Sequence, residues 1–96
     1  MNPMHFITVL DVENEEIKYQ SCIGYFESYE EARQVVEENR YDIYEATYDY
    51  VVIESVPTGI YQKALATHWF KMYQEGYAKI EEPKFAEDFL GIAIGG

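Results

Sequence analysis

The sequence predicts an α+β protein in which one main helix packs on one face of an antiparallel sheet of about four to five strands. Three observations support this class. Apolar, β-branched and aromatic stretches recur along the chain, one capped amphipathic segment interrupts them, and short polar or glycine-containing turns separate neighbouring stretches. The expected order is two strands, the helix, a third strand, a hairpin and a short C-terminal helix.

Three segments in the first sixty residues have the pattern of strands. Residues 5–12 are apolar and β-branched, and residues 17–26 alternate between apolar and polar positions. The polar residues 13–16 between them predict a hairpin turn. Residues 48–56 form a third strand, which Pro and Gly in residues 57–59 bring to an end.

The main helix is expected to begin at Ser28. Glu31 follows three residues later, which is the pattern of a capping box. The next apolar residues share one face at helical spacing, namely Tyr29, Ala32, Val35 and Val36. The helix is expected to end near Asn39 or Arg40.

The last third of the chain predicts shorter elements. Residues 62–66 have the composition of a single helical turn, and Gln74 to Gly76 read as a hairpin loop. The flanking strands, the final helix and a last short strand are expected at 68–73, 77–80, 84–90 and 91–95, with Gly91 as the cap of that helix.

Length and composition predict a single cytoplasmic domain spanning residues 1–96. Apolar residues make up 48% of the chain and aromatic residues 17%, enough to build a core. The N-terminus lacks the pattern of a signal peptide, and no apolar run is long enough to span a membrane. Cys22 is the one cysteine, and we expect it to be a small buried strand residue.

Charge is the most distinctive property of the sequence. Eighteen acidic and seven basic residues give a net charge of −11. Residues 27–54 contain nine acids and two bases, so −7 of that charge lies in this segment. Direct binding to nucleic acid or to an acidic membrane surface is disfavoured, because both attract Lys and Arg. A basic protein surface is the expected partner.

Four helical glutamates, Glu30, Glu31, Glu37 and Glu38, are the first candidate binding residues. They span about 12 Å along a helix at 1.5 Å per residue. That is about one negative charge per 3 Å, close to the 3.4 Å spacing of phosphates in one DNA strand. The pattern indicates a nucleic-acid mimic, or else an ordinary solvated helix face.

The segment after the helix supplies the second set of candidates. It interleaves tyrosines with acids, and the residues that we assign to partner binding are Asp42, Tyr44, Glu45, Tyr48 and Asp49. Tyrosines are enriched at protein interfaces, and acids beside them suit a basic partner. In the alternative interpretation, alternate tyrosines belong to the core and the acids only face water.

The sequence contains no motif for catalysis, for a cofactor or for a metal. His5 and His68 are far apart and have no partner at a metal-ligand spacing. No nucleophile motif is present, and pairs of carboxylates arise by chance among so many acids. We therefore predict a protein that is not an enzyme and needs no cofactor.

Three stretches carry a family resemblance: residues 23–32, from Ile-Gly-Tyr-Phe to Glu-Glu-Ala, residues 50–61, and residues 68–73 with their continuation to Pro83. They resemble small uncharacterised proteins of Firmicutes and their phages, which form a domain family of unknown function. The resemblance covers most of the chain. It implies a compact α+β accessory protein of phage origin, and it implies no catalytic residue.

Together, these observations predict a non-enzymatic acidic binding protein. The specific hypothesis is a phage-borne inhibitor of a host defence nuclease, of the anti-CRISPR or anti-restriction type. It would act by nucleic-acid mimicry or by docking on a basic protein surface. Two alternatives stay open: a small structural module that forms a homodimer, and a small-ligand domain with a pocket beneath Trp69, Phe70 and the C-terminal helix.

Overall fold

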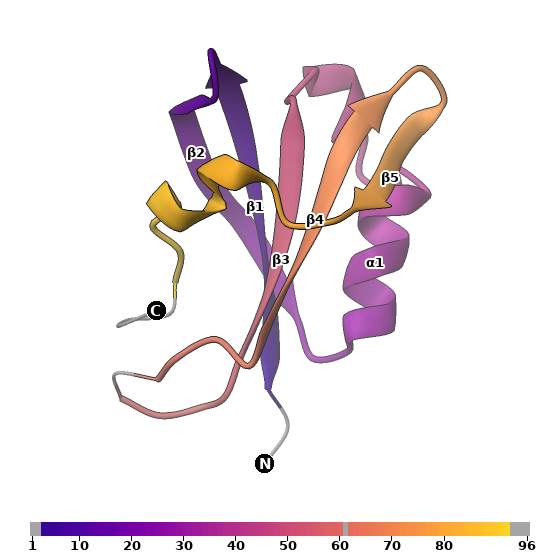
Figure 1. The fold of residues 1–96 in the computed structure, drawn as a ribbon. Helices are drawn as coiled ribbons and strands as arrows, with labels where there is room; N and C mark the ends of the chain where they lie inside the picture. Colours follow the sequence, from indigo (N-terminus) through magenta and orange to yellow (C-terminus); the bar gives the residue numbers. More distant parts are fainter. Residues whose placement is uncertain (1–2, 61, 93–96) are drawn as a thin grey trace.

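A five-stranded antiparallel sheet is the main element of the computed structural model, which describes residues 3–60 and 62–92 (Figure 1). Its strands lie in the order β2-β1-β3-β4-β5. They are β1 (Met4–Glu13), β2 (Glu16–Phe26), β3 (Tyr50–Val56), β4 (Ala66–Tyr73) and β5 (Gly76–Ile80). The described helices are α1 (Tyr29–Glu37) and two 3-10 helices, η1 (Tyr44–Ala46) and η2 (Lys84–Asp88). The predicted α+β class, with an antiparallel sheet and one main helix, is confirmed.

The connection between β2 and β3 positions the helix. Both strands pair with β1 in the antiparallel sense, so they run parallel to each other with β1 between them. A connection between such strands must cross a face of the sheet. The segment that contains α1 makes this crossing, and α1 contacts β1, β2, β3 and β5.

The core on the helix side is built by alternate strand residues. Ser28 caps α1, because its side chain accepts a hydrogen bond from the backbone N–H of Glu31. This confirms the predicted start of the helix. The buried cluster beneath the helix consists of Ile7, Val9, Ala32, Val35, Val36, Ile43, Val51, Ile53, Phe70 and Tyr77.

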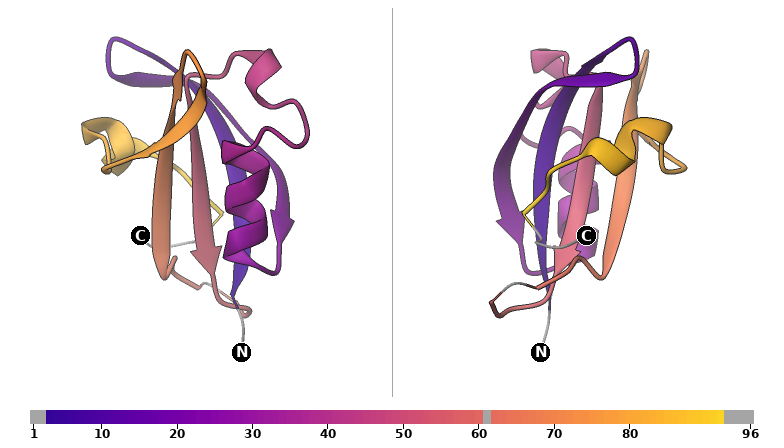
Figure 2. Two further views of the ribbon diagram at one scale, coloured as in Figure 1. Left: turned by 90° about the vertical axis from the view of Figure 1, so that its right-hand side faces the viewer. Right: turned by 60° about the vertical axis from the view of Figure 1, so that its left-hand side comes forward.

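A second, smaller core lies on the opposite face of the sheet. Leu10, Val52 and Trp69 are buried there beneath Phe85 of η2. The ring of Trp69 makes edge-to-face contacts with Phe85 and Phe89, at centroid distances of 5.6 and 5.4 Å. Figure 2 shows α1 and η2 on opposite sides of the sheet. The sheet is therefore covered on both faces.

The chain after η2 is anchored to a buried carboxylate. The side chain of Glu54, on β3, is 3% exposed and accepts a hydrogen bond of 2.8 Å from the backbone N–H of Ile92. A Cβ atom at Gly91 would overlap the Glu54 carboxylate. Gln20 Nε2 donates a hydrogen bond to the Leu90 carbonyl. The segment thus lies close against the sheet.

Several local expectations are wrong. The helix ends at Glu37 with Glu38 as its cap, because Asn39 takes a φ of 52°, which a continuing helix does not allow. Residues 62–66, all of which the structure describes, do not form a helical turn, since Ala66 already begins β4. Cys22 is exposed, because β2 is an edge strand.

The C-terminal predictions also need correction. In place of a helix over residues 84–90, the chain forms the 3-10 helix η2, which is capped by Phe89 and not by Gly91. So short a helix has little stability of its own, and the packing of its phenylalanines on Trp69 determines its form. Residues 91–92 are not in a strand, and the rest of the predicted last strand lies outside the described residues.

Substituting alanine at two glycines tests this packing. Gly91→Ala should lower the free energy of unfolding by about 1–3 kcal/mol, because the new methyl group overlaps the Glu54 carboxylate. Gly24→Ala is the matched control, since a Cβ there meets nothing within 4 Å. Its stability should be unchanged or higher by up to about 1 kcal/mol. Urea unfolding of both variants checks this, and equal stabilities would contradict it.

Candidate docking groove beside the helix

The four predicted helical glutamates lie in two rows with different surroundings. Glu30 and Glu37 flank Arg33, whose guanidinium makes ion pairs with both carboxylates. The distance from Arg33 Nη1 to Glu37 Oε2 is 2.5 Å. Hydrogen bonding to Arg33 lowers the pKa of Glu30 below its usual range. One arginine thus compensates part of the charge of this row.

Glu31 and Glu38 form the second row, and Val35 lies between them on the same side of the helix. The spacing of four and three residues gives this alignment. Both glutamates are exposed. Glu38 makes one exposed ion pair with Arg40, at 3.4 Å. Exposed ion pairs of this kind contribute little to stability. The Glu31 carboxylate makes no ion pair within the described part of the chain. This row therefore presents its charge to solvent.

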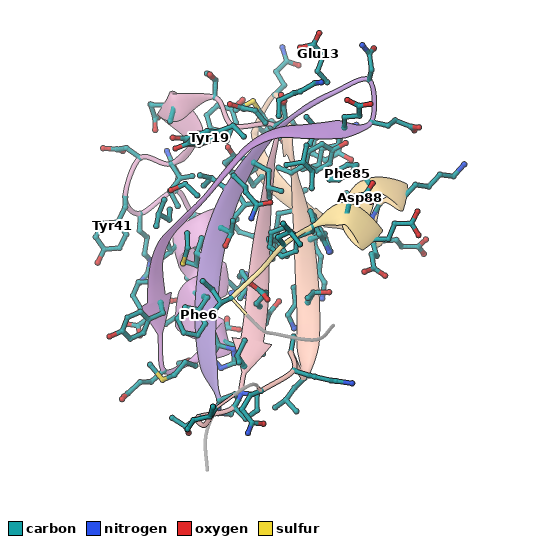
Figure 3. All side chains as sticks on the ribbon, turned by 90° about the vertical axis from the view of Figure 1, so that its left-hand side faces the viewer. Phe6, Glu13, Tyr19, Tyr41, Phe85 and Asp88 are labelled. Carbon is teal, nitrogen blue, oxygen red and sulfur yellow. The ribbon has the colours of Figure 1, made fainter. Side chains whose placement is uncertain are left out.

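An open apolar groove of about 270 Å³ lies between α1 and the edge strand β2. The buried residues Ile7, Val35 and Ile43 line it. Ile23 of β2 and Tyr41, in the loop after α1, lie at its rim, and their side chains are 49% and 70% exposed. Figure 3 shows Tyr41 at the outer border of the molecule. We call this surface the β2–α1 groove.

Both tyrosines assigned to partner binding, Tyr44 and Tyr48, have contacts within the fold. The Tyr44 hydroxyl donates a hydrogen bond of 2.6 Å to the Tyr73 carbonyl, which ties η1 to the end of β4. The ring of Tyr48 stacks on that of Tyr19, at a centroid distance of 6.0 Å. The backbone carbonyl of Tyr48 accepts a hydrogen bond from the hydroxyl of Tyr77, whose pKa is raised by burial. These tyrosines hold the segment against the sheet.

Two of the three predicted acids in this segment also have partners within the fold. Glu45 accepts a hydrogen bond of 2.9 Å from Asn39 Nδ2. Asp49 accepts one of 2.9 Å from the backbone N–H of Val12. Asp42 is exposed between Tyr41 and the buried Ile43, so it lies beside the β2–α1 groove. Among the tyrosine-segment candidates, Asp42 is therefore the acid closest in sequence to the groove lining.

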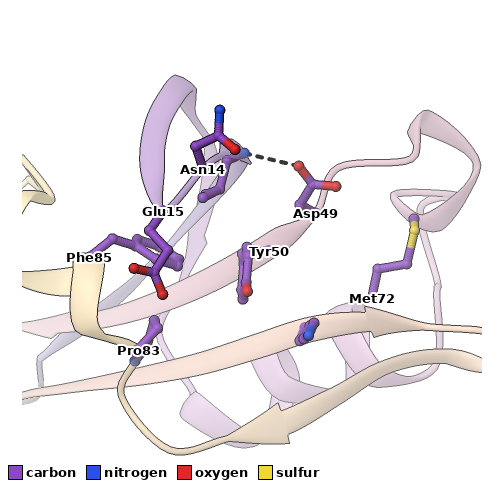
Figure 4. Close-up of a pocket in the computed structure, with 9 residues that line it drawn as sticks. Asn14, Glu15, Asp49, Tyr50, Met72, Pro83 and Phe85 are labelled. Atoms are coloured by element: carbon purple, nitrogen blue, oxygen red, sulfur yellow. Dashed lines mark hydrogen bonds between the residues drawn. The ribbon is translucent and has the colours of Figure 1, made fainter.

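A second cavity, of about 410 Å³, lies at the end of the sheet that carries the β1–β2 turn (Figure 4). Tyr50 and Phe85 form an aromatic wall, with their rings in edge-to-face contact at 4.9 Å. Its charged lining is mixed, because it contains the acids Glu15 and Asp49 together with the base Lys71. Since Asp49 also binds the β1 backbone, this cavity is less suited than the groove to a basic partner.

A cluster of rings with one serine closes the helix-side core at the opposite end of the sheet. His5 Nδ1 lies 2.7 Å from Ser55 Oγ, and both side chains are buried. The ring of Tyr29, from α1, contacts both histidines, at 5.9 Å from His5 and 4.4 Å from His68. His68 Nδ1 lies 3.3 Å from Lys79 Nζ. Because burial closes the Ser–His contact off from solvent, we assign it a packing role.

The residues that define the groove were not among the sequence candidates. Ile23, Gly24 and Tyr41 line it together with Val35 of α1, and none of the four predicted glutamates is part of its lining. Ile23 has the pattern of an ordinary strand residue, and its exposure follows from the position of β2 at the sheet edge. Tyr41 lies in the tyrosine-rich segment, but only its exposure distinguishes it from the other tyrosines there.

Comparisons with protein families, with curated proteins and with solved structures find no match for this chain. None of the described helices is long and apolar enough to cross a membrane. Within residues 3–60 and 62–92, no group of three or more His, Cys, Asp and Glu side chains is placed to hold a metal ion.

The histidine cluster predicts a pH dependence of stability. Burial lowers the pKa of His5 in the folded protein, and burial together with nearby Lys79 lowers that of His68. The unfolded chain therefore binds more protons below the ordinary histidine pKa of 6.5. The stability that these neutral histidines provide is complete above that pH, and it is lost as the pH falls toward their folded pKa values.

Urea unfolding at pH 7.5 and at pH 5.5 measures this dependence; the interval lies above the titration of most carboxylates, at about pH 4. We expect a lower free energy of unfolding at pH 5.5. The variant His68→Gln, which cannot titrate at this position, should show a smaller difference. An equal or larger difference in the variant would contradict the assignment.

Proposed function

We propose that this protein is a non-enzymatic acidic binding protein that docks on a basic protein surface with the side of α1 that faces β2. One observation carries the proposal: Glu31 and Glu38 present exposed carboxylates on both sides of Val35, the α1 residue that lines an open apolar groove. An apolar centre with a polar, solvent-accessible rim is the usual anatomy of a protein-binding surface. The net charge of −11 favours a basic partner by long-range attraction.

The geometry supports docking on a basic protein surface more than mimicry of nucleic acid. Arg33 lies between Glu30 and Glu37 and pairs with both, which leaves Glu31 and Glu38 as the carboxylates on the side of α1 that carries Val35. Seven residues of helix separate them by about 10.5 Å, about three times the phosphate spacing of one DNA strand. A host defence nuclease, whose nucleic-acid-binding surface would be basic, remains the partner that we propose, and a phage origin remains part of the same proposal.

The alternative of a homodimer formed through an edge strand is less favoured. Two β-bulges interrupt β2, because Lys18 and Ile23 have no partner in the register with β1. Bulges and an edge lysine are devices that oppose strand-to-strand association. Two chains of charge −11 would also repel each other. The edge that carries the exposed tyrosines is therefore a poor surface for self-pairing.

A matched pair of double variants tests the proposed surface. Glu31→Gln/Glu38→Gln and Glu30→Gln/Glu37→Gln each remove two carboxylates, so both leave the same net charge. The first should weaken the binding of a short oligolysine peptide about two- to thirtyfold, the loss expected for two surface ion pairs. The second should change it less, because Glu30 and Glu37 are paired with Arg33.

Calorimetric titration at low salt gives both affinities, and binding should weaken at higher ionic strength. Equal effects of the two double variants would contradict the proposed location. No measurable binding of oligolysine by the unmodified protein would contradict the proposed function itself.

A further inference from the structure

We infer that the β2–α1 groove is an anchor pocket that takes one large apolar side chain from the basic partner, with a lysine or arginine on each side of that anchor. This inference rests on the proposed function, because it assumes a basic partner on the same side of α1. It adds the chemical class of the segment recognised: a central apolar residue between two cations.

The size of the groove fits one side chain. Its volume of about 270 Å³ lies just below the range of about 300–1,000 Å³ of pockets that hold drug-sized ligands. Its lining includes Ile7, Val35 and Ile43, which are 1%, 3% and 6% exposed and thus belong to the rigid core. An apolar side chain entering it would meet a preformed apolar surface.

The rim of the groove is unusually apolar for exposed surface. Ile23 and Tyr41 are among the most exposed large apolar residues of the described chain, and both line this one groove. Neighbouring exposed apolar groups next to a pocket are typical of interaction sites. An apolar anchor seated between Ile23 and Tyr41 would remove their side chains from water along with its own.

The charged row sets the pattern of the partner. Glu31 and Glu38 lie about 10.5 Å apart along the helix axis, one on each side of Val35. In an extended segment, residues at i−2, i and i+2 point to the same face, and the outer two are about 13 Å apart. Flexible lysine or arginine side chains span the difference. The recognised pattern is therefore cation-x-apolar-x-cation in an extended segment.

Occupants of other kinds fit less well. An acidic or neutral segment would leave Glu31 and Glu38 without complementary charge. A second copy of this chain would bring a further charge of −11 toward the same surface. The charge of the surface thus selects a basic segment of a different protein.

Gly24 provides a direct test, because it lines the groove and pairs with Ile7 in the sheet. A Cβ at this position meets nothing within 4 Å, so a large side chain can be introduced without collision at its first atom. Gly24→Phe should fill the groove and leave the charged row unchanged. The rim variant Tyr41→Ser, at a 70% exposed position, is a second test that leaves the core untouched.

The probes are two peptides with blocked ends and the same charge, Lys-Ser-Leu-Ser-Lys and Lys-Ser-Ser-Ser-Lys. For the unmodified protein, calorimetry should give the leucine peptide an affinity higher by about tenfold or more, the gain expected from burying one leucine side chain. Gly24→Phe should abolish this difference, because its ring would occupy the place of the leucine side chain. Tyr41→Ser should reduce the difference.

The outcomes separate the two proposals. Equal, salt-sensitive binding of both peptides would overturn the anchor pocket and leave the proposed function standing. An advantage of the leucine peptide that survives both Gly24→Phe and Tyr41→Ser would also overturn the groove as its site. If neither peptide binds the unmodified protein, the proposed function and the anchor pocket both fail. Urea unfolding establishes that each variant is folded. If Gly24→Phe does not fold, the result for Tyr41→Ser decides whether the groove is the anchor pocket.

Discussion

The burial of β3 on both faces is the constraint on which the rest of the structure depends. Six consecutive residues of this strand, Val51 to Val56, are buried, including one carboxylate, that of Glu54. A strand that exposes neither face needs a cover on each side of the sheet. α1 provides the cover on one side, and η2 with the chain to Ile92 provides it on the other. The helix α1, which follows β2, and the 3-10 helix η2, which follows β5, therefore lie on opposite faces of β3.

The candidate groove follows from a mismatch between the helix and the sheet. Five strands at about 4.8 Å separation are about 19 Å wide, whereas a helix with its side chains is about 10–12 Å across. One nine-residue helix that must cover β3 and β1 leaves the edge strand β2 partly uncovered. The gap at that edge is lined by core residues, and one of them, Val35, lies between the exposed Glu31 and Glu38 on α1.

Much of the fold could be predicted from local patterns. The α+β class and the capped start of α1 at Ser28 follow from periodicity and from the capping residues, which act over a few positions. The exposure of Cys22 and the form of η2 could not be predicted, because the first depends on the place of β2 at the edge and the second on contacts with Trp69. The four helical glutamates look equivalent in sequence, but their charges differ in effect because only one row is paired with Arg33.

The sequence by itself determined the net charge, its concentration between Glu27 and Glu54, and the apolar face of the helix, because each depends only on composition and spacing. Only the tertiary structure decided which of these features meet at a surface. In the folded protein, Tyr44, Tyr48 and Asp49 make contacts within the fold. Ile23 and Tyr41 lie at one groove with Val35, which separates Glu31 from Glu38 along α1. The physical reason is strand order: the place of a residue in the sheet sets its exposure, and contacts between segments distant in the chain set that place.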